Sequence, residues 1–443
     1  MRKLGLILTG VCMVVLLGLT GCAGKEKKTD AQGKESGTVP VLTEEDFHPG
    51  NATVFQTEKG YYYYGAREPG FRYYDSATGK DMYLCNKPEC RHDGNEFCVA
   101  TNEKYVIERV GMYGGRLWAT AVEETDTQFL FHLISVAPDG SELNEYVTYL
   151  TIEKTGVIPG SHMGGSQLFL HRNVALIPLG LMGDDGTGTT KYYGATVIRL
   201  DTKEVTYLDE EPFSVEYEPI SNITAHGDYF YYCRKEGKKT VLHRYNIKDG
   251  SDEIHKLLVG FQGNYIVQDD NTIVYTKSGN YELCVFHRET GQNEEKVKLT
   301  EKQTVFYSDG TTGEQDVPYE AVDIKTDGEY IYVRDQYVRK VQHDEDFNEV
   351  EAREEAGIHI FDRELREVAW LNMAEVMKEY AKELRSDTED FYYYFNRYMY
   401  YEKDAVYCML HNVRDTSGDP VYRCTRESFL SGNPDFELAM IYK

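Results

Sequence analysis

Seven polar turns recur along this chain of 443 residues, and each follows a strand-like segment. The clearest unit begins at Gly227-Asp228-Tyr229-Phe230-Tyr231-Tyr232 and ends at the turn Asp249-Gly250. This pattern predicts a strand entered from a Gly-Asp turn, then a second strand closed by an Asp-Gly turn. Aligned on residues 75, 137, 201, 246, 288, 362 and 425, successive turns are 62, 64, 45, 42, 74 and 63 residues apart. A repeat of small antiparallel sheets therefore constrains the fold more than the chain length does.

The repeat predicts an all-β fold, a β-propeller of seven blades covering residues 51–443, because four-stranded blades recur every 40–50 residues or so. Six or eight blades also fit the spacing, and the longer intervals imply inserted loops. The expected opening strands cover residues 61–64, 116–119, 168–170, 229–232, 272–275, 330–333 and 398–401. Several are apolar at successive positions, as in strands covered on both faces. A pair of β-sandwiches is the main alternative, but it predicts a break in composition near the middle, which the sequence lacks.

One helix is expected outside the repeat. Within residues 373–385, apolar side chains fall at helical spacing, at Val376, Met377, Tyr380, Ala381 and Leu384. The pattern predicts a short accessory amphipathic helix that packs on the propeller.

The first two dozen residues form a targeting signal. Arg2 and Lys3 precede an apolar segment from Leu4 to Leu19, and Leu19-Thr20-Gly21-Cys22 follows as a small-residue box. This arrangement resembles the bacterial lipoprotein signal, which implies a diacylglyceryl group with palmitate-like chains on Cys22 and removal of residues 1–21. An uncleaved membrane helix is the alternative.

Residues 22–50 are expected to be a lipidated cysteine followed by a disordered tether. The segment after Cys22 is rich in Lys, Glu, Gly, Ser and Asp and offers almost nothing to bury. Two acyl chains suffice for stable anchoring, so the predicted location is the extracytoplasmic face of the cell membrane.

The charge of the chain limits its partners. The formal net charge is -26, and loss of Arg2 and Lys3 with the signal leaves -28. Such an acidic surface repels phosphate backbones, so nucleic acid is excluded as a partner. Cations, basic peptides and neutral glycans remain compatible with this charge.

One group of residues has the spacing of a metal site. Cys85, Cys90, His92 and Cys98 form the pattern C-x4-C-x-H-x5-C. Three thiolates and an imidazole can close tetrahedrally on one structural Zn²⁺ ion, since these are the ligands that zinc prefers. A disulfide between two of the cysteines, with the third thiol spare and His92 at the surface, stays open as the alternative outside the cytoplasm.

The other cysteines have simpler expectations. Cys408 and Cys424 flank a hairpin turn and are candidates for a cross-strand disulfide. Cys233 and Cys284 lie inside apolar strands and are expected to be buried thiols.

The lipoprotein box, the tyrosine-rich repeat and the Cys85–Cys98 loop together resemble cell-surface lipoproteins of Gram-positive bacteria with TolB-like or quinoprotein-like propellers. The resemblance implies a location and a fold, and it supplies no catalytic residues and no ligand.

The expected function is a non-enzymatic binding module of the bacterial cell envelope, with a protein, peptide or glycan as its partner. The sequence contains no G-x-S-x-G elbow, H-E-x-x-H helix or phosphate-binding glycine loop. Two alternatives remain. One is a carboxylate-based, glycosidase-like hydrolase, which predicts two inward carboxylates roughly 5–9 Å apart. The other is an accessory or sensory subunit of a membrane system.

Overall fold

A computed structural model describes most of the chain from residue 47 onward. The described residues are 47–48, 53–95, 97–154, 168–184, 190–208, 210–212, 220–255, 258–277, 279, 281–306, 312–335, 338–343, 349–355, 357–381, 399–410 and 418–443. Residues Val41–Lys443 form one compact unit, separate from Met1–Pro40. The signal segment, Cys22 and nearly all of the expected tether lie outside the described residues, so these remain predictions.

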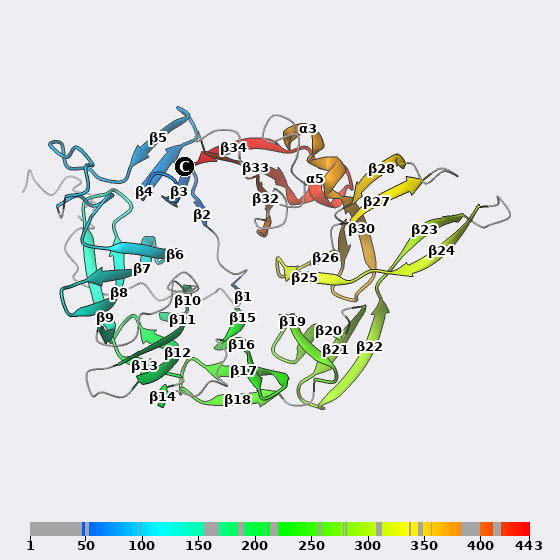
Figure 1. The fold of residues 1–443 in the computed structure, drawn as a ribbon, viewed down its shortest axis with the longest axis horizontal. Coiled ribbons are helices and arrows are strands. Elements are labelled where there is room, and N and C mark those ends of the chain that lie inside the picture. The colour runs from blue at the N-terminus through cyan, green and yellow to red at the C-terminus, as the bar shows by residue number, and fades with distance from the viewer. Residues whose placement is uncertain are drawn as a thin grey trace, which may run out of the picture. The chain divides into compact units, whose positions relative to one another are not determined.

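The unit is an all-β propeller of seven blades, each built from four antiparallel strands that are consecutive along the chain except in the sixth blade. Figure 1 shows the blades arranged around a centre in chain order, from blue through green to red. The first strand of each blade lies nearest the centre and the fourth lies outermost (Figure 1).

Every blade has the same strand order, with insertions only in the sixth. Blades 1 to 3 comprise β2 (Val54–Gln56), β3 (Gly60–Gly65), β4 (Gly70–Asp75), β5 (Lys80–Tyr83); β6 (Val106–Tyr113), β7 (Arg116–Glu124), β8 (Gln128–Val136), β9 (Leu143–Glu153); and β10 (Phe169–His171), β11 (Val174–Asp184), β12 (Thr190–Arg199), β13 (Val205–Tyr207). Blades 4 and 5 comprise β15 (Ser221–His226), β16 (Tyr229–Glu236), β17 (Lys239–Asn246), β18 (Asp252–His255); and β19 (Phe261–Val267), β20 (Thr272–Lys277), β21 (Glu282–His287), β22 (Gln292–Lys298). Blades 6 and 7 comprise β25 (Ala321–Thr326), β26 (Ile331–Asp335), β29 (Gly357–Phe361), β30 (Glu367–Asn372); and β31 (Met399–Tyr401), β32 (Ala405–Met409), β33 (Asp419–Thr425), β34 (Glu437–Tyr442).

All seven predicted turns lie in the connections between the third and fourth strands of the blades, but the last, at residues 425–427, begins a short helix instead of a turn. The expected opening strands are less uniform. Five of them coincide with second strands, whereas residues 168–170 and 398–401 overlap the first strands β10 and β31. Aromatic composition marks burial between blades, and first and second strands are both buried there, so composition alone does not distinguish them.

The core lies between neighbouring blades rather than within any one sheet. One cluster between blades 4 and 5, for example, joins Tyr231, Cys233 and Leu242 to Ile273 and Tyr275. Each of these side chains is at most 1% exposed. Strands covered on both faces explain why the apolar residues do not alternate with polar ones.

Blade 7 closes the ring against blade 1. The cluster at this junction contains Tyr61, Tyr63, Ala405, Tyr407, Met409, Val421 and Met440. The amide of Ala66 donates a hydrogen bond to the carbonyl of Lys443 at 2.7 Å. All strands of blade 7 come from the C-terminal part of the chain (Figure 1), so closure depends on packing and not on a strand supplied by the N-terminus.

Short additional strands decorate the ring. β1 (Phe47–His48) pairs with β15 at the inner edge of blade 4, with Phe47 opposite His226. β14 (Glu210–Pro212) pairs with β12, and a single bridge between Asp184 and Glu153 joins the sheets of blades 2 and 3.

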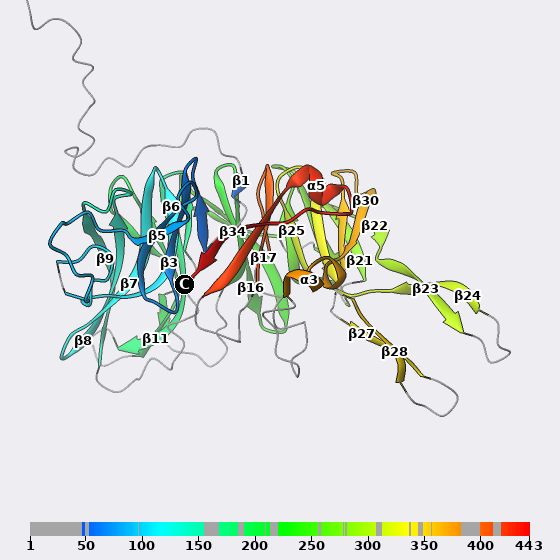
Figure 2. The same ribbon diagram turned by 90° about the horizontal axis from the view of Figure 1, so that it is seen from above.

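Two hairpins account for the longest turn interval. β23 (Thr300–Phe306) pairs with β24 (Thr312–Pro318) before blade 6, and β27 (Val338–His343) pairs with β28 (Glu349–Glu355) inside it. Both project outward beyond the blades (Figure 2). The prediction of inserted segments here is confirmed.

The expected accessory helix is present as two four-residue helices, α2 (Met373–Val376) and α3 (Lys378–Ala381). Asn372 caps α2 by accepting a hydrogen bond from the Ala374 amide, and Met377 separates the two helices. The predicted C-terminal part, after residue 381, lies outside the described residues. A third short helix, α5 (Arg426–Leu430), follows β33. No helix of the described residues is long and apolar enough to cross a membrane.

Buried arginine and histidine side chains connect third strands to fourth strands in several blades. Arg72 lies 2.6 Å from Asp81, His243 lies 2.7 Å from Asp252, and His359 lies 2.7 Å from Glu367. Each carboxylate offsets the cost of burying its partner. The pairing also fixes the register of the outer strand.

The His359 pair predicts a pH-dependent contribution to stability. Burial lowers the pKa of this imidazole, but the nearby carboxylate of Asp335 and the hydrogen bond to Glu367 outweigh burial and raise it overall. The stabilisation should be fully present below the unfolded pKa, about 6.5, and should be lost as pH rises through the higher folded pKa. We expect Glu367→Gln to lower the melting temperature most at pH 5.5–6 and least at pH 8–9, as measured by calorimetry. An equal decrease at every pH would contradict this assignment.

Candidate metal centre and adjoining pocket

The loop between β5 and β6 joins blade 1 to blade 2 and contains the predicted metal ligands. Cys85, Cys90, His92 and Cys98 each offer one donor atom, and all four atoms lie within 4.8 Å of one another. Cys98 is fully buried, and the other three are partly buried. The local spacing in the sequence thus brings the four predicted residues into one cluster.

Neighbouring groups orient these donors. The His92 ring lies 5.1 Å from the Tyr83 ring, and its Nδ1 lies 3.5 Å from the Cys98 Sγ. The amide and hydroxyl of Thr101 both donate to this sulfur, at 3.3 and 3.2 Å. These contacts hold the Cys98 sulfur in place beside His92.

Hydrogen bonds also act on the Cys85 thiol. Burial raises its pKa, but backbone N–H groups of Lys87 and Val99 outweigh burial and lower it overall. The donor set, the buried position and these hydrogen bonds suit a metal that prefers thiolate ligands. The cluster could therefore hold a metal ion. Cys85, Cys90 and Cys98 are all free thiols here. The metal interpretation uses all four donors, whereas a disulfide would leave one thiol and His92 without a role.

Blade 2 holds this loop through Gly140. The amide of Asn86 donates to the Gly140 carbonyl at 3.1 Å. Gly140 has a φ of +68°, and a Cβ at this position would lie 2.7 Å from both the Leu84 carbonyl carbon and the Cys85 nitrogen. Only glycine allows this approach without moving the backbone of the loop.

Gly140→Ala should therefore destabilise the protein by about 2 kcal/mol or more, because the side chain adds crowding to the strain of a left-handed backbone. Gly237→Ala is the matched control, since Gly237 has a φ of +61° and no atom lies within 4 Å of the point that its Cβ would occupy. Its cost should be about 1 kcal/mol, from the backbone alone. Urea unfolding measures both values, and equal losses would show that the close approach has no energetic importance.

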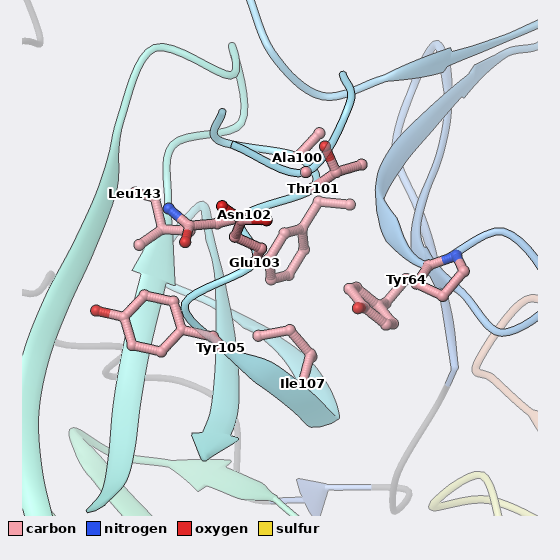
Figure 3. Close-up of a pocket in the computed structure, with 11 residues that line it drawn as sticks. Tyr64, Ala100, Thr101, Asn102, Glu103, Tyr105, Ile107 and Leu143 are labelled. Carbon is pink, nitrogen blue, oxygen red and sulfur yellow. The ribbon is translucent and has the colours of Figure 1, made fainter. Parts of the chain in front are cut away.

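A pocket of about 250 Å³ lies beside the metal loop, between blades 1 and 2. It is lined by Tyr64, Pro69, Phe71, Gly94, Ala100, Thr101, Asn102, Glu103, Tyr105, Ile107 and Leu143. Figure 3 shows the rings of Tyr64 and Tyr105 on opposite sides, with Ile107 between them and residues 100–103 along a third side. The loop that contains the metal ligands thus also supplies part of the pocket wall.

A second group of potential metal ligands lies on blade 2. Glu123, His132 and Glu145 come from β7, β8 and β9 and could also hold an ion. The Lys104 ammonium lies 3.1 Å from a Glu123 oxygen and 2.9 Å from a Glu145 oxygen. Because this cation already neutralises the carboxylates, the group is better explained as an ion-pair network.

Sequence reasoning missed this network for a physical reason. Its members are neighbours only through strand register, which places His132 opposite Ala121 and Thr148. The network also fixes Tyr105, whose hydroxyl donates to Glu145 at 2.7 Å. Burial, followed by that hydrogen bond, raises the pKa of Tyr105 to about 12.

The structure corrects the expected geometry of Cys408 and Cys424. Strand register pairs Cys408 with Tyr422 and Cys424 with Val406, so the two cysteines are diagonal neighbours rather than directly opposed. Both are free and buried in the core between blades 6 and 7. Cys233 and Cys284 are confirmed as buried thiols.

The inner strands of blades 4 to 6 line a small cavity of about 70 Å³. Its described lining includes one carboxylate, Asp323, which lies 3.5 Å from the Lys325 ammonium. The pair of carboxylates that a glycosidase needs is therefore not found in this cavity.

No protein-family model and no curated protein matches this sequence. Several solved structures align with this chain at low similarity. Kluyveromyces lactis Hsv2 aligns over 86% of this chain and 94% of its own, with 9% identity and a TM-score of 0.41. An acylaminoacyl peptidase from Pyrococcus horikoshii aligns over 72% of this chain at 11% identity and a TM-score of 0.38. A post-proline cleaving enzyme from Rickettsia typhi aligns over 83% at 10% identity and a TM-score of 0.36. This chain covers only 45% of the acylaminoacyl peptidase and 58% of the post-proline cleaving enzyme. The low TM-scores support no functional argument.

Proposed function

We propose that this chain is a lipid-anchored, extracytoplasmic β-propeller that serves the bacterial cell envelope as a non-enzymatic binding module. The lipoprotein-like box ending at Cys22 supports the anchor and the location. The net charge of -26 supports a partner other than nucleic acid. A rigid ring of blades with inserted loops is a scaffold suited to binding, because loops on such scaffolds vary without disturbing the core.

The metal loop has a structural role in this proposal. Cys85, Cys90, His92 and Cys98 bind one Zn²⁺ ion and leave no open position for a substrate, as in structural zinc sites. The ion holds the connection between blades 1 and 2 in place. The observation on which the proposal chiefly rests is that this loop, with four donor atoms within 4.8 Å, also forms a wall of the neighbouring pocket.

Affinity isolation from cross-linked membranes tests the binding role. The lipidated protein should recover an envelope protein, peptide or glycan in stoichiometric amount, and Cys22→Ser, which cannot be lipidated, should lose it. A Cys408→Ala form is the matched control, because it removes a thiol from the core and keeps the anchor.

Recovery of the protein alone would contradict the binding module. The carboxylate-based hydrolase would then be the better explanation, and a screen of glycosidase substrates tests it directly. Recovery of an integral membrane protein would instead assign the chain to a membrane system as its accessory subunit.

A further inference from the structure

The pocket beside the metal loop has the chemistry of a cation site. Three of its walls are aromatic, formed by Tyr64, Phe71 and Tyr105. The rings of Tyr64 and Phe71 meet edge to face, with centroids 5.2 Å apart, so each supports the position of the other. Tyr105 is held from behind by Glu145, and its hydroxyl therefore does not point into the pocket (Figure 3). Aromatic faces held in this way attract cations through their negative electrostatic potential.

The charged group of the pocket is a carboxylate. Glu103 is the one residue of the Asp, Glu, Lys, Arg and His types among the described lining residues. No lysine, arginine or histidine of the described chain lies within ion-pair distance of its carboxylate. The neighbouring cation, Lys104, is engaged by Glu123 and Glu145 and lies 4.9 Å from the centre of the Tyr105 ring. The rings of Tyr64 and Phe71 are therefore the ones on which a ligand cation chiefly depends. The pocket therefore combines aromatic faces with an uncompensated negative charge.

The main chain positions Glu103 beside the metal loop, and its side chain is exposed to solvent. The amide of Glu103 donates to the Gly94 carbonyl at 3.0 Å, which ties it to the metal loop. Figure 3 shows Glu103 on the side of the pocket formed by residues 100–103, between Tyr64 and Tyr105. Apolar contacts from Ile107 and Leu143 complete the lining. A ligand that fits must carry positive charge and also present apolar surface.

We propose that this pocket binds a small organic ammonium ion whose nitrogen bears alkyl groups. The cavity of about 250 Å³ is just below the usual range for drug-sized ligands, so a compact ligand is indicated. Alkyl groups on nitrogen pack against aromatic faces, and the charge interacts with the rings and with Glu103. Phosphates and carboxylates are repelled. The inference rests on the proposed binding role and specifies the ligand class for one site.

Choline and its uncharged carbon isostere, 3,3-dimethylbutan-1-ol, are the probes for this site. They have nearly the same shape and differ in charge. Isothermal titration calorimetry on the purified protein should show choline binding at least about tenfold more tightly, since the attraction of a desolvated cation to aromatic faces is of that order. Equal affinity of the two probes, or no binding of choline, would overturn the proposal.

Three variants test whether choline binds in this pocket. Glu103→Gln should weaken choline binding about threefold to tenfold and leave the isostere unchanged. Tyr64→Leu should weaken choline binding by a similar factor. Glu58→Gln removes the same charge from an exposed turn residue of blade 1 outside the pocket and should leave binding unaltered. Equal losses in Glu103→Gln and Glu58→Gln would show a general charge effect and refute the site.

The test is independent of the envelope partner. Each variant must retain the melting temperature of the unsubstituted protein, which separates a lost site from a lost fold. Failure of choline binding with an envelope partner recovered from membranes would refute this inference alone. Choline binding without any recovered partner would refute the proposed interaction role and leave the site standing.

Discussion

Cys90→Ala is expected to abolish zinc binding and to lower the free energy of unfolding by about 4 kcal/mol when free zinc is a thousandfold above its dissociation constant. The loss of stability comes from the lost metal binding, because Cys90 is only partly buried and its side chain contributes little to the apolar core. Chelation should lower the melting temperature of the unsubstituted protein and have no effect on this variant. Differential scanning calorimetry with and without chelator measures both effects.

Cys424→Ala is the control for this experiment. It removes a buried thiol that lies between blades 6 and 7 and belongs to a different cluster. It should keep one zinc ion and keep the response to chelator. If Cys90→Ala and Cys424→Ala respond alike to chelator, the metal does not bind at Cys85, Cys90, His92 and Cys98.

Tyr63→Ala should destabilise the protein by about 3–5 kcal/mol, which is typical of an aromatic side chain removed from a core. Tyr63 has no exposed surface, and its ring lies 5.3 Å from that of Tyr442 in blade 7. Its hydroxyl donates to Asp81 at 2.8 Å. The substitution thus opens a cavity where the last blade meets the first. Chemical denaturation followed by circular dichroism measures the loss.

Two further substitutions separate packing from hydrogen bonding at this junction. Tyr63→Phe keeps the ring and should cost only about 1–3 kcal/mol, from the lost hydrogen bond to a charged acceptor, because Asp81 remains paired with Arg72. Tyr281→Ala removes a tyrosine that is 44% exposed and should cost much less. If Tyr63→Ala were no worse than Tyr281→Ala, closure of the ring would not depend on the packing between blades 7 and 1.

The turns were the predictable part of the fold. Each polar turn acts locally, so residues 246–250 and 288–291 indicate the end of a strand without any knowledge of the rest of the chain. That this strand is the third of its blade is seen only in the structure. First and second strands are harder to distinguish, because both are buried between blades. The helix near residue 373 was predicted from periodicity alone, which does not anticipate the break at Met377.

The candidate site also has one part that the sequence predicts and one part that it does not. Cys85, Cys90, His92 and Cys98 lie within one loop, so spacing was enough to predict that they meet. Glu123 and Glu145 meet His132 only through the pairing of three strands, which the sequence does not specify. For Cys408 and Cys424, the strand register differs from what the local sequence suggests. A short hairpin suggested that they face each other, but the register places them two residues apart on adjacent strands.

The metal content of the purified protein tests the central claim most directly. Elemental analysis should find one zinc ion per chain, and X-ray absorption at the zinc edge should show three sulfur ligands and one nitrogen ligand. Protein that contains no metal, with a disulfide between two of Cys85, Cys90 and Cys98 and one thiol left free, would contradict the account.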